Sequence, residues 1–402
     1  MSIIGGVRTS TAADLRSANL SRALRAVHEA DSPLTRAELG RRLGCVRATV
    51  GALVSDLDAL GLVRERAAET TGRRGRPSAR LGPAEEGPVV VALEITTHAA
   101  RTATIPIGGA PCDVTTEALP GREVDAVLDT ARSLLARRLD TLTGRHAGVG
   151  VAMHGLVDRR TRRVLSAPGL GWADLDLDVL DRLGLPADRR ARIDNVANSS
   201  ALAESVRGRA RGVGTVLYLH AAVGLGGALL ADGRLVAGRR GLAGEYGHLP
   251  FGTGDRLCRC GNRGCWETSV DQVALAEAAG RDATPWTAET VAGEVLADGS
   301  RSARDAVART ASALGRGIGA LVTAVDPDLV LLAGHAATLF AAASERVHEA
   351  AAAACLPLHR SDLPPIETST LGDDAGLVGA AESVYAVLLD DPATLMTPWT
   401  AA

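Results

Sequence analysis

Three cysteines and one histidine within a stretch of 18 residues constrain the local fold of this chain more than any other feature. Cys258, Cys260 and Cys265 lie within eight residues, and His248 precedes them. Three thiolates and one imidazole can surround a zinc ion tetrahedrally and leave no coordination position open. A disulfide framework is the weaker interpretation, because such frameworks are typical of short secreted chains. The sequence therefore predicts one structural zinc ion per chain, held by these four side chains.

Length and composition predict a globular protein of two or three domains. The chain has 402 residues, of which 46% are hydrophobic and 23% charged, and such a length exceeds one ordinary core. No apolar run approaches the roughly 18 residues that span a bilayer, and the N-terminus lacks the apolar segment of a signal peptide. We therefore expect a cytoplasmic location and no membrane partner. The isolated Cys45, Cys112 and Cys355 are expected to be small buried apolar residues.

Positive charge is concentrated at the N-terminus. Residues 1–83 carry 14 arginines against 8 acidic residues, a balance of +6, although the net charge of the whole chain is −3. The remaining residues must therefore carry about −9. A basic head on an acidic body is the distribution expected when only the head meets nucleic acid.

Three closely spaced helical patterns in the head predict a helix-turn-helix. Thr35 and Glu38 form a capping-box pattern at the start of the second helix, and Gly44 permits a tight turn before the third. Leu62–Glu65 then indicates a short strand. The apolar positions at helical spacing are Leu20, Leu24 and Val27, then Leu39 and Leu43, then Val46, Val50, Leu53, Leu57 and Leu60.

The exposed faces of the second and third helices are suited to double-stranded DNA. Small residues and one arginine near the start of the third helix suit close approach to base edges in the major groove. Arginines on the second helix suit phosphate contacts. The alternative is a three-helix protein-interaction module with a solvated charged face. The predicted contacts are Arg47, Thr49 and Ser55 to bases, and Arg36, Arg41 and Arg42 to phosphates.

A segment rich in glycine and arginine follows the third helix and predicts a wing. Its arginines Arg73, Arg74 and Arg76 resemble those of an AT-hook, in which an extended arginine-glycine-arginine strand lies in a narrow minor groove. A flexible linker is the alternative interpretation of such a run. We expect a flexible N-terminus over residues 1–18, a winged helix-turn-helix over 19–82 and a linker over 83–87.

From residue 88 to 402 the pattern changes to mixed strands and helices, which predicts an α/β architecture of two lobes. The expected strands are Pro88–Ile95, Arg101–Ile105, Gly148–Met153, Thr215–Leu219, Gly226–Leu230 and Leu329–Ala333. The expected helices are 123–138, Asn195–Arg207, most of 269–325, and a final helix from about Ala375.

The body resembles the ROK family of sugar kinases and sugar-responsive repressors. The resemblance rests on Gly244–His248, on Cys258–Glu267 and on Ala375–Ala381. It implies an actin-like (ribonuclease H-like) domain of two lobes with the structural zinc site. The kinases of the family lack an N-terminal head, so the architecture looks like the repressor branch. The body is then expected to sense a ligand and to form oligomers.

The resemblance also implies which residues bind a sugar. In the family, hexose hydroxyls are bound by an Asn-Asp pair, by the Glu and His of a Gly-Glu-x-Gly-His motif, and by the Glu after the last zinc cysteine. The matching residues here are Asn195, Glu245, His248 and Glu267. His248 is expected both to bind zinc and to face the ligand. Support of the zinc loop is the alternative role for the two glutamates.

Three departures from the kinase pattern predict that phosphoryl transfer has been lost. Val196 replaces the aspartate that serves the family as catalytic base, and valine cannot accept a proton. Glu94–His98 lacks the glycines of the first phosphate loop, and Ala222–Gly226 lacks the threonine of the second. His154 and Gly169 also depart from the family pattern around the pocket. Val196 favours a ligand that lacks one hydroxyl, or a pocket that no longer binds sugar.

The combined expectation is a transcriptional regulator, a repressor of carbohydrate-metabolism genes, rather than an enzyme. A homodimer or homotetramer would present two heads to a palindromic DNA operator, and a sugar between the lobes would change the affinity for DNA. Two alternatives stay open. One is a constitutive DNA-binding regulator whose sugar site is degenerate, and the other is a sugar kinase with a DNA-binding head.

Overall fold

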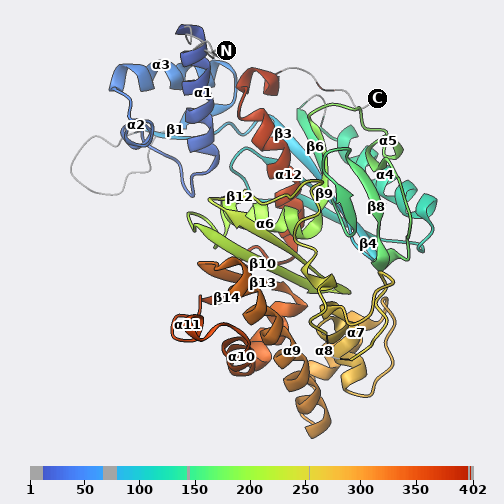
Figure 1. The fold of residues 1–402 in the computed structure, drawn as a ribbon. Helices are drawn as coiled ribbons and strands as arrows, with labels where there is room; N and C mark the ends of the chain where they lie inside the picture. The colour runs from blue at the N-terminus through green and yellow to red at the C-terminus, as the bar shows by residue number, and fades with distance from the viewer. Residues whose placement is uncertain (1–11, 67–78, 143–144, 253, 397–398, 400–402) are drawn as a thin grey trace, which may run out of the picture.

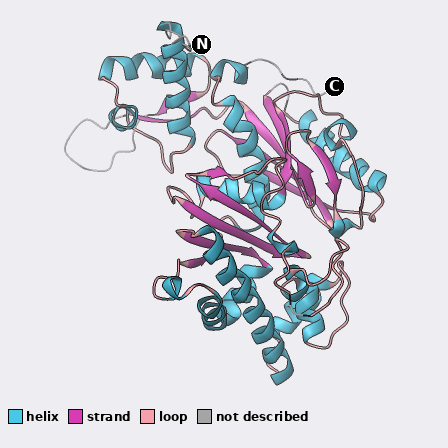
Figure 2. Cartoon of the chain, in the orientation of Figure 1, coloured by secondary structure: helices cyan, strands magenta, loops and turns pink. Residues whose placement is uncertain are grey.

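The computed structural model describes residues 12–66, 79–142, 145–252, 254–396 and 399. It consists of a small helical head and a body of two lobes, each built on a mixed β-sheet (Figures 1 and 2). No helix in these described ranges has the length and apolar character needed to cross a membrane.

The head contains the three helices that the sequence predicts. Thr35 and Glu38 form the expected capping box, in which the Glu38 amide donates to Thr35 Oγ1 at 3.1 Å and the Thr35 amide donates to Glu38 Oε2 at 2.6 Å. Gly44 has a φ of 65°, as the tight turn requires. The elements are α1 (Ala12–His28), α2 (Arg36–Leu43), α3 (Arg47–Ala59) and an antiparallel pair, β1 (Val63–Arg66) with β2 (Arg80–Pro83).

Two details of the head differ from the sequence-based expectation. The first helix begins at Ala12 rather than at residue 19, so residues 12–18 are helical; residues 1–11 lie outside the described ranges. An ion pair between Arg16 and Asp56 on α3, with atoms 2.8 Å apart, holds this added length against the head. Val46 does not belong to the core, since it is the N-cap of α3 and is 72% exposed.

The first lobe is built on a five-stranded sheet in the order β5-β4-β3-β6-β9. Strands β3, β4 and β5 are antiparallel neighbours, whereas β6 and β9 join β3 in parallel. Helix α4 (Val124–Asp140), as predicted, covers one face of the sheet. The strands are β3 (Val89–Ile95), β4 (Ala99–Pro106), β5 (Cys112–Ala118), β6 (His146–Met153) and β9 (Ala191–Asn195), with a small hairpin of β7 (Leu156–Asp158) and β8 (Arg163–Ser166), and α5 (Val179–Arg182) follows that hairpin.

The second lobe repeats the same topology. Its sheet has the order β12-β11-β10-β13-β14, again three antiparallel strands followed by two parallel ones. No short repeat in the sequence indicates this duplication. The elements are β10 (Thr215–Ala222), β11 (Gly224–Ala231), β12 (Arg234–Leu235), β13 (Leu329–Gly334) and β14 (Ile366–Thr368), with α7 (Gln272–Ala278), α8 (Ala288–Ala297), α9 (Arg301–Val325), α10 (His335–Ala354) and α11 (Pro357–Arg360).

Two helices pack against each other between the lobes. They are α6 (Val196–Arg207), which follows β9, and α12 (Ala375–Leu388), which follows β14 (Figure 1). Gly379 of α12 permits the close contact, because a Cβ atom there would lie 1.6 Å from the carbonyl oxygen of Ser199 on α6. Helix α6 therefore lies between α12 and the sheet of the second lobe, where it contacts β11.

The core of the head is continuous with the core of the first lobe. Leu24 and Leu57 of the head belong to the same apolar cluster as Ile105 of β4 and Tyr385 of α12. Of the isolated cysteines, Cys355 is buried as expected and Cys45 is half-buried, whereas Cys112 is exposed, because it begins the edge strand β5, whose residues are mostly exposed. The head is thus packed against the body and is not attached by the linker alone.

Candidate functional site

A pocket lies between the two lobes, where the parallel strands of the first sheet end. His154 follows the end of β6, and Asn195 ends β9 and caps α6. The turn between β10 and β11 forms the opposite wall. All four residues that the resemblance assigned to ligand binding, namely Asn195, Glu245, His248 and Glu267, line this one pocket. Their role in binding stays a prediction.

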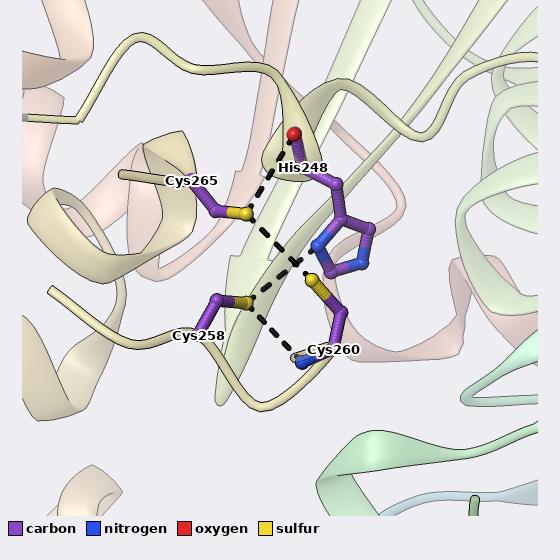
Figure 3. A group of neighbouring side chains, drawn as sticks. All are labelled: His248, Cys258, Cys260 and Cys265. Atoms are coloured by element: carbon purple, nitrogen blue, oxygen red, sulfur yellow. Dashed lines mark hydrogen bonds between the residues drawn. The ribbon is translucent and has the colours of Figure 1, made fainter. Parts of the chain in front are cut away.

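The predicted metal ligands converge beside the pocket (Figure 3). One ligand atom from each of His248, Cys258, Cys260 and Cys265 lies within 4.8 Å of all the others. Nδ1 of His248 is 3.8 Å from Sγ of Cys258, and the Sγ atoms of Cys260 and Cys265 are 3.7 Å apart. Zinc–sulfur bonds of about 2.3 Å in a tetrahedron separate their ligands by about 3.7 Å. The four side chains therefore fit a metal ion with the geometry expected for zinc.

His248 connects the metal centre to the pocket. Its Nδ1 atom points toward Cys258, whereas its Nε2 atom is 3.9 Å from Oε2 of Glu245 (Figure 3 shows the ring). Burial, and to a smaller extent the neighbouring Glu267, raise the pKa of Glu245 from its ordinary value near 4.5 to about 7. Glu267 is itself 5% exposed, and one of its oxygens is 3.1 Å from Sγ of Cys258. Both glutamates thus touch the metal centre and the pocket.

Asn195 already makes structural hydrogen bonds. Its Oδ1 accepts from the Ala197 amide at 2.7 Å, and its Nδ2 donates to the Gly155 carbonyl at 2.6 Å. The first bond caps α6, and the second holds the loop after β6. The neighbouring Val196 is buried and lines the pocket with an apolar side chain. A ligand that bonds to Asn195 must therefore affect the start of α6.

In the segment that matches the first phosphate loop of the kinases, the side chains of Glu94 and Thr97 are packed against their neighbours. A Cβ atom at Gly169 would lie 2.8 Å from Cγ2 of Thr97, so the Thr97 methyl occupies space that a side chain at residue 169 would need. Glu94 is buried and pairs with Arg101, with Oε2 and Nη1 2.9 Å apart. Burial raises the pKa of Glu94 to about 7. These contacts leave Glu94 engaged inside the first lobe.

Sequence reasoning placed His154 near the pocket only as a departure from the family pattern, and it missed His220 and Arg259. The rings of the two histidines lie 6.2 Å apart, and burial lowers the pKa of His154 to about 3 and of His220 to about 4. Both are therefore neutral at pH 7. Arg259 pairs with Asp271 at 2.7 Å and lies 3.5 Å from Glu267. The departure at residue 154 was the only sequence signal for any of them.

The predicted DNA-contact residues of the head that the structure describes lie on its surface, but Arg36 is engaged by a neighbouring carboxylate. Arg41, Arg42, Arg47 and Ser55 are exposed and Thr49 is half-buried. Arg36 differs, because its guanidinium forms two hydrogen bonds with Glu65 of β1, at 2.6 and 2.7 Å. Arg36 therefore fixes the hairpin to α2 and is less free to reach a phosphate. The wing residues Arg73, Arg74 and Arg76 lie outside the described ranges.

The two duplicated lobes with a pocket between them define a sugar-kinase-like α/β fold. The sequence model of the ROK family matches residues 113–386 of this chain. The chain therefore belongs to the ROK family. A solved ROK family transcriptional regulator, a homologue of the E. coli MLC protein, is similar over 95% of this chain and 99% of its own, with a TM-score of 0.74 and 22% identity.

Both branches of the family occur among the similar proteins. A ROK family glucokinase from Streptomyces griseus, solved with glucose and AMPPNP, covers 73% of this chain and 98% of its own, with a TM-score of 0.61 and 25% identity. A xylose repressor from Caldicellulosiruptor bescii is 29% identical over 264 residues, which are 61% of this chain. The match spans 64% of that repressor's length.

Proposed function

We propose that this chain is a sugar-responsive transcriptional regulator, a repressor of carbohydrate-metabolism genes without kinase activity. The main structural support for this proposal is helix α6. It begins in the pocket, where Asn195 caps it, and it ends at Arg207, which contacts the head. The similarity to a xylose repressor supports the same function.

The head has the features of a winged helix-turn-helix. The tight turn at Gly44 leads into α3, whose exposed face carries Arg47, and the β1–β2 hairpin follows. We propose residues 19–82 as the DNA-binding domain, 83–87 as a linker and 88–402 as the ligand-sensing and oligomerisation domain. A homodimer or homotetramer would place two recognition helices on a palindromic operator.

The pocket supports a sugar or sugar derivative as effector. Glu245, Glu267 and Asn195 supply acceptors and a donor for hydroxyl groups, and Val196 supplies an apolar wall. Sites of this kind combine a few placed polar groups with apolar walls. The preferred ligand lacks a hydroxyl, or carries an apolar group, at the position that faces Val196.

Three features of the cleft oppose phosphoryl transfer. Val196 cannot act as a general base. Thr97 lies close beside Gly169, and Glu94 is paired with Arg101. Because phosphoryl transfer depends on backbone and metal contacts to phosphate, these side chains would account for the proposed loss of that activity.

A zinc ion held by His248 and the three cysteines would cross-link the loop that carries both glutamates. Such an ion contributes folding energy and fixes the orientation of neighbouring side chains. His248 Nε2 lies toward Glu245, so the position of that carboxylate depends on the metal centre.

Helix α6 provides a route from the pocket to the head. Arg207, in its last turn, donates to the carbonyl oxygen of His28 in α1 at 2.9 Å and to Glu382 of α12 at 2.8 Å. A ligand that changes the hydrogen bonds of Asn195 would shift the helix start, and a rigid helix transmits that shift to its other end. Sugar and DNA would then favour different positions of α6, which couples their affinities.

The test is fluorescence anisotropy with a labelled promoter fragment from the protein's own gene neighbourhood, with and without hexoses, pentoses, amino sugars and their phosphates. We expect one sugar to weaken DNA binding, and Glu245→Ala and Glu267→Ala to abolish that response. Glu289→Ala, an exposed substitution on α8, is the matched control. Zinc analysis of each variant separates lost ligand contacts from a lost metal site.

The head is tested in the same assay. Arg47→Ala should weaken binding to the specific fragment by about 1–3 kcal/mol, as expected for loss of a base contact, whereas Arg316→Ala on α9 should have no effect. Tight DNA binding that no sugar changes would favour a constitutive regulator. Turnover of ATP with any hexose would contradict the proposed loss of kinase activity.

A further inference from the structure

A second cleft lies between the head and the body. It is lined by α1 of the head, by β9, α6 and α12, and by the turn that joins β11 to β12. None of its lining residues belongs to the pocket between the lobes. The proposed sugar site does not use this space.

Arginines from separate elements gather in this cleft. Arg159 follows β7, Arg192 is on β9, and Arg234 is on β12. Within the described ranges, Arg192 and Arg234 have no hydrogen bond or ion pair, whereas Arg159 pairs with Asp194 at 2.8 Å. Burial, and then the neighbouring Arg159 and Arg162, lower the pKa of Arg192. Arg192 is therefore a half-buried cation beside other cations, and Asp194, the acidic residue that acts on it, is already paired with Arg159.

The carboxylates of the cleft do not compensate the charge of Arg192. Asp390 pairs with Arg25 at 2.9 Å, and Glu29 lies 3.9 Å from the same arginine. Glu382 is bound by Arg207 and His28. Among the described carboxylates of the lining, only Asp232, in the turn before β12, forms no ion pair. The inner part of the cleft thus has a positive balance that an anion would neutralise.

We propose that this cleft binds a small phosphate-bearing molecule through Arg159, Arg192 and Arg234. The planar guanidinium group donates two parallel hydrogen bonds to a phosphate, which makes arginine the side chain best suited to this ligand. A half-buried charge without a partner costs free energy, and the bound phosphate removes that cost. The outer wall is formed by α1, so a bound molecule also touches the head.

The cleft is connected to the sugar pocket through Asp194. Its Oδ2 pairs with Arg159, and its Oδ1 accepts hydrogen bonds from the Asn195 amide at 2.8 Å and from Asn198 Nδ2 at 2.9 Å. A phosphate that binds Arg159 weakens the ion pair between Arg159 and Asp194. The hydrogen bond from the Asn195 amide to Asp194 is then weakened too, and Asn195 lines the sugar pocket. Two effectors, one neutral and one anionic, would thus act on the same end of α6.

The test titrates the full chain, without DNA, with inorganic phosphate and separately with a hexose 6-phosphate. Chloride keeps the ionic strength constant, and calorimetry and thermal unfolding report binding. We expect saturable binding of phosphate to the native protein and to Arg316→Ala. Binding should weaken at least about tenfold in Arg192→Ala and Arg192→Gln, because a hydrogen bond to a charged group is lost.

A second readout distinguishes a binding site from a structural role. In chloride alone, Arg192→Ala should be at least as thermally stable as the native protein, because the substitution relieves repulsion with Arg159. Glu245→Ala should retain phosphate binding, so a failed sugar response does not affect this test. Equal phosphate binding by the native protein and Arg192→Ala, or no saturable binding of either anion, would overturn the proposal.

Discussion

Replacing Arg207 with alanine should loosen the head from the body. In the native protein Nε of Arg207 donates to Oε1 of Glu382, and Nη1 donates to the carbonyl oxygen of His28. The other carboxylate oxygen of Glu382 is 2.8 Å from Nε2 of His28. Glu382 is 4% exposed, so the variant would leave a buried carboxylate without its arginine.

The expected cost follows from the burial of the pair. Removing one partner of a buried ion pair costs about 3–5 kcal/mol. We expect the lower end, about 3 kcal/mol, because Arg207 is 14% exposed and His28 stays beside Glu382. Arg211→Ala is the matched control. Its ion pair with Asp31 also links body to head, but the Asp31 side chain is 87% exposed, so we expect about 0–1 kcal/mol.

The measurement is urea denaturation followed by circular dichroism, combined with hydrogen exchange of the amides in α1. Arg207→Ala should lower the midpoint and increase exchange in α1, whereas Arg211→Ala should change neither. The double variant Arg207→Met with Glu382→Gln should recover part of the loss, because it leaves no unpaired buried charge. If Arg207→Ala costs no more than Arg211→Ala, the buried contact does not hold the head, and the proposed route along α6 fails with it.

Three further predictions concern the metal centre, the helix contact and a buried carboxylate. Purified protein should contain one zinc ion per chain, and Cys265→Ser should lower both the zinc content and the temperature of unfolding. Gly379→Ala should destabilise the fold by about 1–3 kcal/mol, since its Cβ would collide with α6, whereas Gly293→Ala, in open space on α8, should stabilise it by about 0.5–1 kcal/mol. Because burial raises the pKa of Glu94 in the folded state, the protonated carboxyl group stabilises the fold below pH 4.5. This contribution to the free energy of unfolding is lost as the pH rises to about 7. The unfolding free energy of Glu94→Gln relative to the native protein should therefore increase between those pH values, and a constant difference would contradict the assignment.

The sequence predicted the features that depend on neighbouring residues. The capping box of Thr35 and Glu38 spans four residues, and the turn at Gly44 needs only one residue with a permissive backbone. The metal ligands lie within 18 residues, so a single loop brings them together. Apolar periodicity likewise located α4, α6 and half of the strands in the described ranges, because helix and strand periods are properties of the local chain.

Short or flanking elements were less predictable. Strand β9 was not among the expected strands, because it is only five residues long and leads directly into α6. The edge strand β5 is mostly exposed and therefore lacks the apolar alternation that marks a strand. The start of α1 depends on an ion pair between Arg16 and Asp56, which are 40 residues apart.

The sequence alone determined the likeness to the ROK family, the metal-ligand set and the absence of a catalytic aspartate at Val196. Only the tertiary structure decided that Thr97 fills the space beside Gly169 and that His220 faces the pocket. It also decided that His28 meets Glu382, 354 residues away. The reason is physical: local patterns fix which face of an element is apolar, but long-range packing decides which polar side chains become neighbours. The proposed route from pocket to head depends on such neighbours.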